Sequence, residues 1–436
     1  MTGPGRTNRA GDATPDGASA TDPGTAPGTA GEAAPDSGPG EPRVLLFTGK
    51  GGVGKTTVAA ATATLAARRG RKTLVVSTDT AHSLADALDV PPADDPAEVA
   101  PGLFAQQVNA QRALERHWGE LREYARGVLV ELGLDEVTSE EITVLPGAEE
   151  VIALLELREQ ARTGAWDVIV VDCAPTAETL RLLALPEALD WHVNRLLPVG
   201  RRVLRAVSPL VRQVARVSTP GDEVIGAAER LHRGLAEVRG LLAGDAASVR
   251  LVLTPEAVVV AEARRTLTSL SLYGYRVDAV IANRVFPAEG ADAWRGGWVT
   301  AQGRRLAEIG ESFAPLPVHT VPYLPAEPVG VPALAALAES LYGEADPFAR
   351  PAAPPPLRVG PDGAGGWELT LALPFADRDS VDLARKGDEL IITAGPYRRV
   401  LALPAALARR TVAEASLRDG RLRVRFESGG PDEREP

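Results

Sequence analysis

A glycine-rich loop between an apolar run and a helical pattern constrains this chain more than any other stretch. The loop is Gly49-Lys50-Gly51-Gly52-Val53-Gly54-Lys55-Thr56-Thr57, and it matches the phosphate-loop pattern G-x-x-x-x-G-K-[ST]. An apolar run at residues 44–48 precedes it, and a helical pattern follows at residues 58–69. Because the pattern is informative only between a strand and a helix, these flanks matter. The sequence predicts a strand, a phosphate-binding loop and a helix, in that order.

Each residue type in the loop fits the binding of a triphosphate. Glycines let backbone N–H groups approach phosphate oxygens closely, and the following helix directs its positive end toward them. Lys55 is predicted to contact the β- and γ-phosphates, and the Thr56 hydroxyl is predicted to bind Mg²⁺. The predicted nucleotide-binding residues of the loop are Gly49, Gly51, Gly52, Val53, Gly54, Lys55, Thr56 and Thr57. The alternative for the pattern alone is a solvated glycine-rich turn.

Lys50 is a second lysine that an ordinary phosphate loop does not need. With it, the loop resembles the deviant Walker A class of P-loop ATPases. In that class the extra lysine reaches the partner's nucleotide across a dimer interface. The resemblance therefore implies a homodimer in which Lys50 acts like an arginine finger, a type of residue worth roughly 10³–10⁵ in rate. The alternative for Lys50 is a solvent-facing charge.

Composition limits the classes of protein that the chain can belong to. With 436 residues, it is long enough for two or three domains. The formal net charge of −11 argues against a dedicated nucleic-acid binder. Cys173 is the only cysteine, so no disulfide or thiolate metal cluster forms within one chain. No apolar run reaches transmembrane length and no signal peptide is recognisable, so we expect a cytoplasmic protein.

Composition also divides the chain into segments. Residues 1–42 contain no Val, Ile, Leu or Phe and are predicted to be disordered, as is the polar tail at 428–436. A proline-rich linker is predicted at 346–356. It separates two predicted domains, at 43–345 and 357–427.

The first of these domains alternates short apolar runs with longer helical patterns. The runs lie at residues 73–77, 168–171, 250–254, 279–282 and 318–321. This alternation predicts an α/β fold, with a mostly parallel sheet covered by helices on both faces. Ligands of such sheets bind beyond the carboxyl ends of the strands.

An acidic residue follows each of two predicted strands. Asp172 ends the run at 168–171, in the Walker B arrangement that holds Mg²⁺ directly or through water. Asp79 follows the run at 73–77 and is placed to polarise the attacking water of a hydrolysis reaction. The alternative is that both acids cap helices.

The stretches around these acids resemble the ArsA-type ATPases. That family includes the ATPase subunit of arsenite efflux pumps and the targeting factor for tail-anchored membrane proteins. Residues 78–86 (T-D-T-A-H-S-L-A-D) are similar to its switch I, D-P-A-H-[SN]-L-x-D-x, and residues 172–183 (D-C-A-P-T-A-E-T-L-R-L-L) to its switch II, D-x-A-P-T-G-H-T-L-R-L-L. Residues 145–150 and 321–330 resemble its P-G-x-[DE]-E and P-x-x-P-x-E-x-x-G stretches. The resemblance implies ATP and Mg²⁺ as cofactors, with Asn283 and Pro322 beside the adenine.

This chain departs from the family pattern at both switches. Thr80 replaces the switch I proline, and Ala177-Glu178 replace the switch II Gly-His. Asp79 and Asp172 are intact, so hydrolysis is expected, while the coupling of switch II to a client is left open. Residues 284–310 contain no cysteine, so the zinc clasp of the targeting factor is not expected. A metalloid-efflux subunit is disfavoured because soft metalloids need thiolate ligands.

A helical insertion is expected at residues 185–245, where the family has a helical subdomain that forms a client groove in the targeting factor. Arginines alternate with apolar residues over 191–220, and no acid interrupts them. This pattern fits a hydrophobic client groove, contact with an anionic membrane, or ordinary helix packing. The lack of methionine beyond Met1 weakens the client-groove interpretation.

Closely spaced strands characterise residues 357–427. Residues 367–374 and 421–426 alternate with period two, and short strands are predicted at 389–393 and 399–403. They predict a small β-sandwich. Residues 373–374, 388–393 and 417–424 resemble motifs of the α-crystallin domain of small heat-shock proteins, which binds unfolded segments or mediates assembly.

The sequence as a whole favours a homodimeric ATPase that couples Mg·ATP hydrolysis to capture and release of a hydrophobic or membrane-associated client. The alternatives are the ATPase subunit of an anion or metalloid efflux system and a nucleotide-gated interaction scaffold. No specific nucleic acid is expected as a partner.

Overall fold

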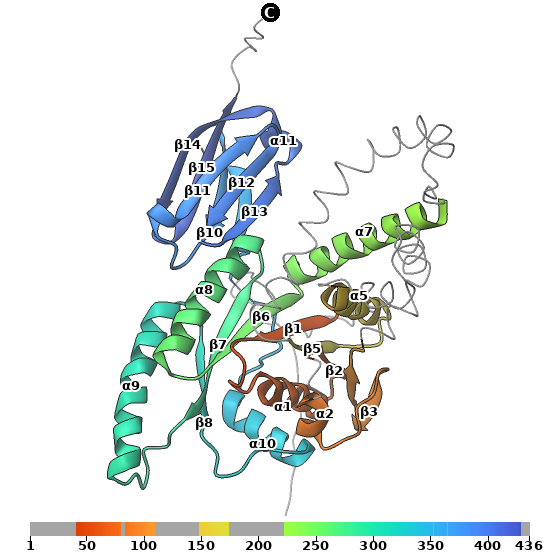
Figure 1. Cartoon of the computed structure of the whole chain (residues 1–436), viewed down its shortest axis with the longest axis vertical. Coiled ribbons are helices and arrows are strands. Elements are labelled where there is room, and N and C mark those ends of the chain that lie inside the picture. Colours follow the sequence, from red (N-terminus) through yellow and green to blue (C-terminus); the bar gives the residue numbers. More distant parts are fainter. Residues whose placement is uncertain are drawn as a thin grey trace, which may run out of the picture. The chain divides into compact units, whose positions relative to one another are not determined.

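The computed structural model describes residues 41–79, 83–109, 148–173, 222–351, 353–363 and 365–428. Its largest sheet has eight strands in the order β3-β4-β2-β5-β1-β6-β7-β8. Figure 1 shows this sheet with the helices that flank it. All neighbouring strands run parallel except β3 and β4. The strands are β1 (Arg43–Thr48), β2 (Thr73–Ser77), β3 (Ala97–Ala100), β4 (Leu103–Gln107), β5 (Val168–Asp172), β6 (Ala247–Leu253), β7 (Val277–Val285) and β8 (Val318–Pro322).

Helices cover both faces of this sheet, as its fully buried central strands require. The helices are α1 (Lys55–Arg68), α2 (Ser83–Leu88), α5 (Ala148–Arg162), α7 (Asp222–Ala243), α8 (Ala257–Tyr273), α9 (Ala293–Phe313) and α10 (Val331–Tyr342). Alanine and threonine fill the middle of α1, and these small side chains let it lie close to the sheet and to α10. The predicted α/β fold with a mostly parallel sheet is confirmed.

Strand β6 spans Ala247–Leu253 and so begins and ends earlier than the predicted run at 250–254; the polar Ser248 interrupts the apolar pattern at its start. Ser248 and Arg250 both lie inside the strand and are buried. The predictions for residues 1–40, switch II after Cys173, Thr80, residues 110–147 and the insertion before Asp222 lie outside the described residues. Helix α7 falls within the predicted helical insertion at 185–245.

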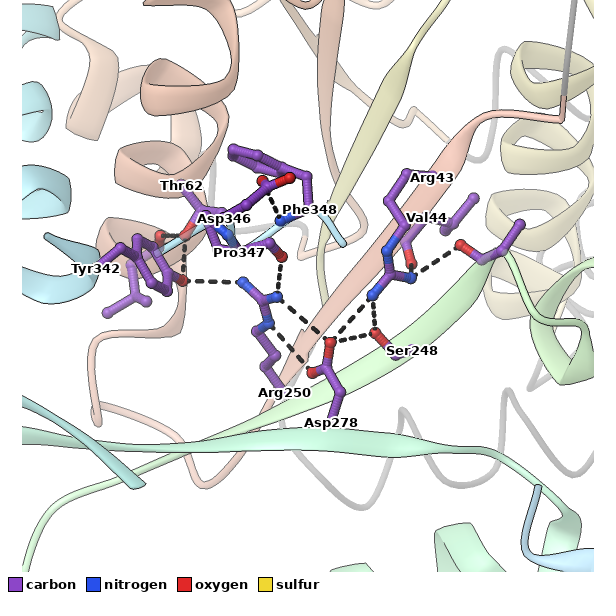
Figure 2. Close-up of polar contacts among 12 residues, drawn as sticks. Arg43, Val44, Thr62, Ser248, Arg250, Asp278, Tyr342, Asp346, Pro347 and Phe348 are labelled. Carbon is purple, nitrogen blue, oxygen red and sulfur yellow. Dashed lines mark hydrogen bonds and ion pairs between the residues drawn. The ribbon is translucent and has the colours of Figure 1, made fainter. Parts of the chain in front are cut away.

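A buried ionic network explains how the sheet accommodates Arg250 (Figure 2). Asp278 at the start of β7 accepts from Arg250 at 3.2 Å and from Arg43 at 3.0 Å. Arg43 also donates to the Ser248 hydroxyl at 2.5 Å, and Arg250 donates to the Tyr342 hydroxyl at 3.1 Å. The Asp278 carboxylate therefore forms ion pairs with two buried guanidinium groups near the amino ends of the strands.

The predicted proline-rich linker starts inside this packing. Arg250 donates to the Pro347 carbonyl, and Phe348 is 2% exposed within the main core. Arg71 pairs with Asp346 at 2.9 Å and lies 4.9 Å above the Phe348 ring. The first residues of the stretch 346–356 are therefore anchored against the domain that contains the eight-stranded sheet.

The C-terminal residues form two facing antiparallel sheets, as the alternating sequence pattern predicts. One sheet has the order β14-β15-β10-β9 and the other β11-β12-β13. The strands are β9 (Leu357–Pro361), β10 (Trp367–Ala372), β11 (Val381–Lys386), β12 (Glu389–Ala394), β13 (Tyr397–Ala402), β14 (Arg410–Arg418) and β15 (Arg421–Ser428), with the short helices η1 (Arg378–Ser380) and α11 (Ala405–Ala408). Alternate residues of β10, β12 and β15 point inward and are buried, which gives the sandwich its own core.

Helix α8 reaches this second core. Leu272, fully buried, belongs to the apolar cluster of the sandwich. The buried Arg399 of β13 donates to the Leu272 carbonyl at 2.6 Å, close to the end of the helix. Such a donor satisfies a carbonyl that has no partner within the helix. A side chain of the sandwich therefore caps the C-terminal end of α8.

Candidate functional site

The predicted phosphate loop connects β1 to α1 at the carboxyl edge of the sheet, and its backbone can be formed only with glycine at two positions. A Cβ atom on Gly54, at a φ of 90°, would lie 2.3 Å from the amide nitrogen of Asn283. A Cβ on Gly49 would lie 2.0 Å from the carbonyl oxygen of Val252. The glycines therefore let the loop lie against β6 and β7.

Lys55 is the first residue of α1 and is 6% exposed. Its ammonium group donates to the Lys50 carbonyl at 3.4 Å, which holds the lysine beside the loop. A buried lysine at a helix N-terminus adds positive charge where backbone N–H groups already face outward. The arrangement is suited to bind the phosphates of a nucleotide.

Asp172 ends β5 beneath this loop and is fully buried. Ser77 donates to its Oδ2 at 3.1 Å, while its Oδ1 is buried with no hydrogen-bond partner among the described residues. Burial raises the pKa of the Asp172 carboxyl from 3.8 to about 6, although a hydrogen bond with Thr56 and the charge of Lys55 oppose the rise. An unpartnered carboxylate oxygen beside a threonine hydroxyl fits Mg²⁺, which needs only one or two protein carboxylates when it also binds phosphates.

Asp79 follows β2 and is half-buried near Asp172, whose pKa its charge raises. Its N–H donates to the Ser77 hydroxyl at 3.3 Å, and its carbonyl accepts from the Gln107 amide at 2.6 Å. Sequence reasoning did not single out Ser77 or Gln107. The signal available in the sequence was their position as polar residues at the carboxyl ends of two strands.

A separate cavity of about 390 Å³ lies beside the loop, where the adenine contacts were predicted. Gly54, Asn283, Pro322 and Tyr323 are among the residues that line it. The Asn283 amide donates to the Val53 carbonyl at 2.8 Å, so Asn283 also holds the loop in place. The structure thus brings the two predicted base-contacting residues, Asn283 and Pro322, to one cavity.

The side chain of Lys50 reaches Glu262 on α8. Its ammonium lies 3.8 Å from the Glu262 carboxylate, and its side chain is 41% exposed. A half-exposed pair at this distance contributes little to stability. The lysine is therefore accessible at the surface beside the loop.

The profile of a family described as "Anion-transporting ATPase" matches residues 42–343, most of the chain. The chain belongs to the ArsA family of ATPases. A second profile, described as "HSP20-like domain found in ArsA", matches residues 364–426. Both predicted resemblances, to ArsA-type ATPases and to small heat-shock proteins, are confirmed, and so is ATP hydrolysis as the type of activity.

Two relatives align with most of this ArsA-family ATPase, and a third aligns with a shorter part of it. A putative arsenical pump-driving ATPase of Prosthecochloris vibrioformis is 36% identical over 389 residues, which are 88% of this chain and 96% of the relative. An uncharacterised protein of Streptomyces coelicolor is 40% identical over 386 residues, covering 88% and 97%. ATPase GET3B of Arabidopsis thaliana is 31% identical over 277 residues, covering 57% and 66%.

The buried carboxylate of Asp172 predicts a pH-dependent stability. Between about pH 4 and pH 6 the folded protein keeps this carboxyl protonated while the unfolded chain ionises it. The folded state then binds more protons, so this group lowers the free energy of unfolding as the pH rises through that window. In EDTA, Asp172→Asn should therefore gain stability relative to the wild type between pH 4 and pH 7, by about 3 kcal/mol. Urea unfolding of both proteins across this range measures the difference, and parallel pH profiles would contradict it.

Proposed function

We propose that this ArsA-family ATPase is a homodimeric switch that couples Mg·ATP binding and hydrolysis to the capture and release of a hydrophobic or membrane-associated protein client. The observation that carries the dimer is Lys50. The loop already has Lys55 buried beside the phosphate position, whereas Lys50 is half-exposed and directed toward α8. Because Lys55 already serves the phosphates of its own chain, the accessible Lys50 is better placed to contact a nucleotide bound to another chain.

The proposed roles in hydrolysis follow from where the side chains lie. Lys55 and the loop N–H groups bind the phosphates, and Thr56 and Asp172 hold Mg²⁺. When bound, Mg²⁺ neutralises charge on the phosphate oxygens. Asp79 accepts a proton from the attacking water or orients it. Lys50 of each chain neutralises charge on the phosphoryl group in the partner's site.

The proposed client is supported by the second domain. The sandwich carries a profile described as HSP20-like, and it completes α8, the helix that also bears Glu262 beside Lys50. Helix α8 thus contacts both Lys50 and the sandwich, which is the proposed client-binding domain. A protein client fits better than a nucleic acid, given the net charge of −11. A cytoplasmic location remains the expectation from the sequence; no helix among the described residues meets the length and apolarity of a membrane span.

A second candidate is the ATPase subunit of an anion efflux system. The names of several relatives, putative arsenical pump-driving ATPases, favour it. The single cysteine opposes metalloid binding: Cys173 is buried, and burial raises the pKa of its thiol to about 12. A protonated, inaccessible thiol is a poor ligand for a soft metalloid.

The oligomeric state tests the switch. Light scattering should show a larger dimer fraction with Mg²⁺ and a non-hydrolysable ATP analogue than with Mg·ADP or without nucleotide. We expect this increase because groups of both chains bind the nucleotide in the proposed dimer, so the binding free energy favours dimerisation. A mass that is the same in all three conditions and equals the monomer would overturn the proposal.

A further inference from the structure

The backbone of Asp79 is held by two buried side chains that no motif of the sequence includes. Ser77, the last residue of β2, accepts from the Asp79 N–H at 3.3 Å and donates to Asp172 at 3.1 Å. Gln107, the last residue of β4, donates from Nε2 to the Asp79 carbonyl at 2.6 Å. The peptide groups on both sides of the Asp79 side chain are therefore fixed to the sheet.

Strand register brings these residues to one level. Ser77 pairs with Asp172 of β5 on one side and with Gln107 of β4 on the other. All three end their strands, so they form a row across the carboxyl edge of the sheet, where ligands of parallel sheets bind. Hydrogen bonds run along this row from Asp172 through Ser77 and Asp79 to Gln107.

Packing alone does not explain an amide at residue 107. Gln107 is 5% exposed, and its Oε1 is buried without a hydrogen-bond partner among the described residues. A buried acceptor left unpartnered is unfavourable, and an apolar side chain of the same length would avoid it. What the Gln107 amide contributes is an N–H group that donates to the Asp79 carbonyl.

The neighbouring Gln106 provides an internal comparison. It is also buried, and its Oε1 is also without a hydrogen-bond partner in the described part of the chain. Its amide donates instead to Glu156 at 2.9 Å and to the Asp94 carbonyl at 3.0 Å. Adjacent residues of a strand point to opposite faces of the sheet, so the two glutamines are both buried but donate hydrogen bonds to different partners.

We propose that Gln107 is a positioning residue for ATP hydrolysis, which fixes the Asp79 main chain so that its carboxylate is held for the attacking water. The inference rests on the role proposed above for Asp79. Gln107 would act on the arrangement reached in the transition state and not on the phosphate loop that binds the nucleotide. Its loss should therefore lower kcat and leave KM for ATP unchanged.

Three variants test this role in the full-length protein: Gln107→Met, Gln107→Glu and Gln106→Met. Methionine keeps the length and volume of the side chain, and glutamate keeps its shape but replaces the donor with an acceptor. Both Gln107 variants should lower kcat by about tenfold or more with KM unchanged. Gln106→Met should keep the wild-type kcat. Hydrogen exchange should also be faster in peptides covering residues 74–79 in the Gln107 variants only.

Thermal unfolding separates positioning from a purely structural role. If Gln107→Met and Gln106→Met lose kcat and melting temperature together and equally, Gln107 only supports the fold and the inference is wrong. It is equally wrong if both Gln107 variants keep wild-type kcat and exchange. Asp172→Asn is measured in parallel: full activity of that variant would overturn the site assignment itself, while its inactivity beside active Gln107 variants would overturn only the inference.

Discussion

Lys50→Ala should lower the turnover of ATP by about 10³-fold while the variant still binds Mg·ATP. The loop glycines and the buried Lys55, which we propose bind the nucleotide of the same chain, are unchanged in this variant. What is removed is a positive charge that the proposed dimer places at the partner's phosphoryl group. Steady-state hydrolysis and binding of a fluorescent ATP analogue measure the two quantities separately. Equal hydrolysis by wild type and variant would rule out the proposed action on the partner's site.

Two further proteins sharpen this test. Glu262→Gln removes the carboxylate that lies 3.8 Å from the Lys50 ammonium, and it should retain turnover, because that half-exposed pair contributes little. Asp172→Asn should be inactive on its own but still supply a normal Lys50. Mixing it with Lys50→Ala should restore activity, since each mixed dimer has one site with an intact Asp172 and an intact Lys50 from the partner. No recovery on mixing would indicate that Lys50 acts on its own nucleotide.

Asp278→Ala should lower the free energy of unfolding by about 3–5 kcal/mol. Asp278 is the carboxylate shared by Arg43 and Arg250, whose side chains are 5% and 4% exposed. Without it, two guanidinium groups remain buried with no carboxylate in this network. Burial already lowers the pKa of Arg43 to about 10, a measure of how unfavourable its charge is there. Urea unfolding followed by circular dichroism measures the loss.

Asp245→Ala is the matched control for Asp278→Ala. Asp245 pairs with the buried Arg276 at 2.8 Å, but its own side chain is 77% exposed. Water can replace such a partner, so the expected loss is at most about 1 kcal/mol. Equal losses for the two variants would show that the Asp278 network is not a major contributor to stability.

Local spacing was enough to predict the phosphate loop, the acids after β2 and β5, and most of the sheet, because these features depend on neighbours in the sequence. Arg250 shows what local spacing misses. It begins the predicted run at 250–254, but no residue near it in the sequence shows how its charge is compensated, because the carboxylate of Asp278 lies on the next strand. Strands β3 and β4 were not predicted, and the role of Gln107 depends on the register between β2 and β4. Pairings between distant segments carry no periodicity that one sequence can show. The predicted roles of the site residues stay predictions until the variants are measured.

The contact between α8 and the sandwich has a consequence for how such chains diversify. Leu272 is part of the sandwich core, and Arg399 satisfies its carbonyl, so each residue depends on the other segment. An ancestor that lost the C-terminal sandwich would leave an apolar side chain and a helix end exposed to solvent. Family members without this domain are therefore expected to carry a polar residue at the position of Leu272 and their own cap at the end of α8. We therefore expect substitutions at the end of α8 to accompany gain or loss of the C-terminal sandwich among members of the family.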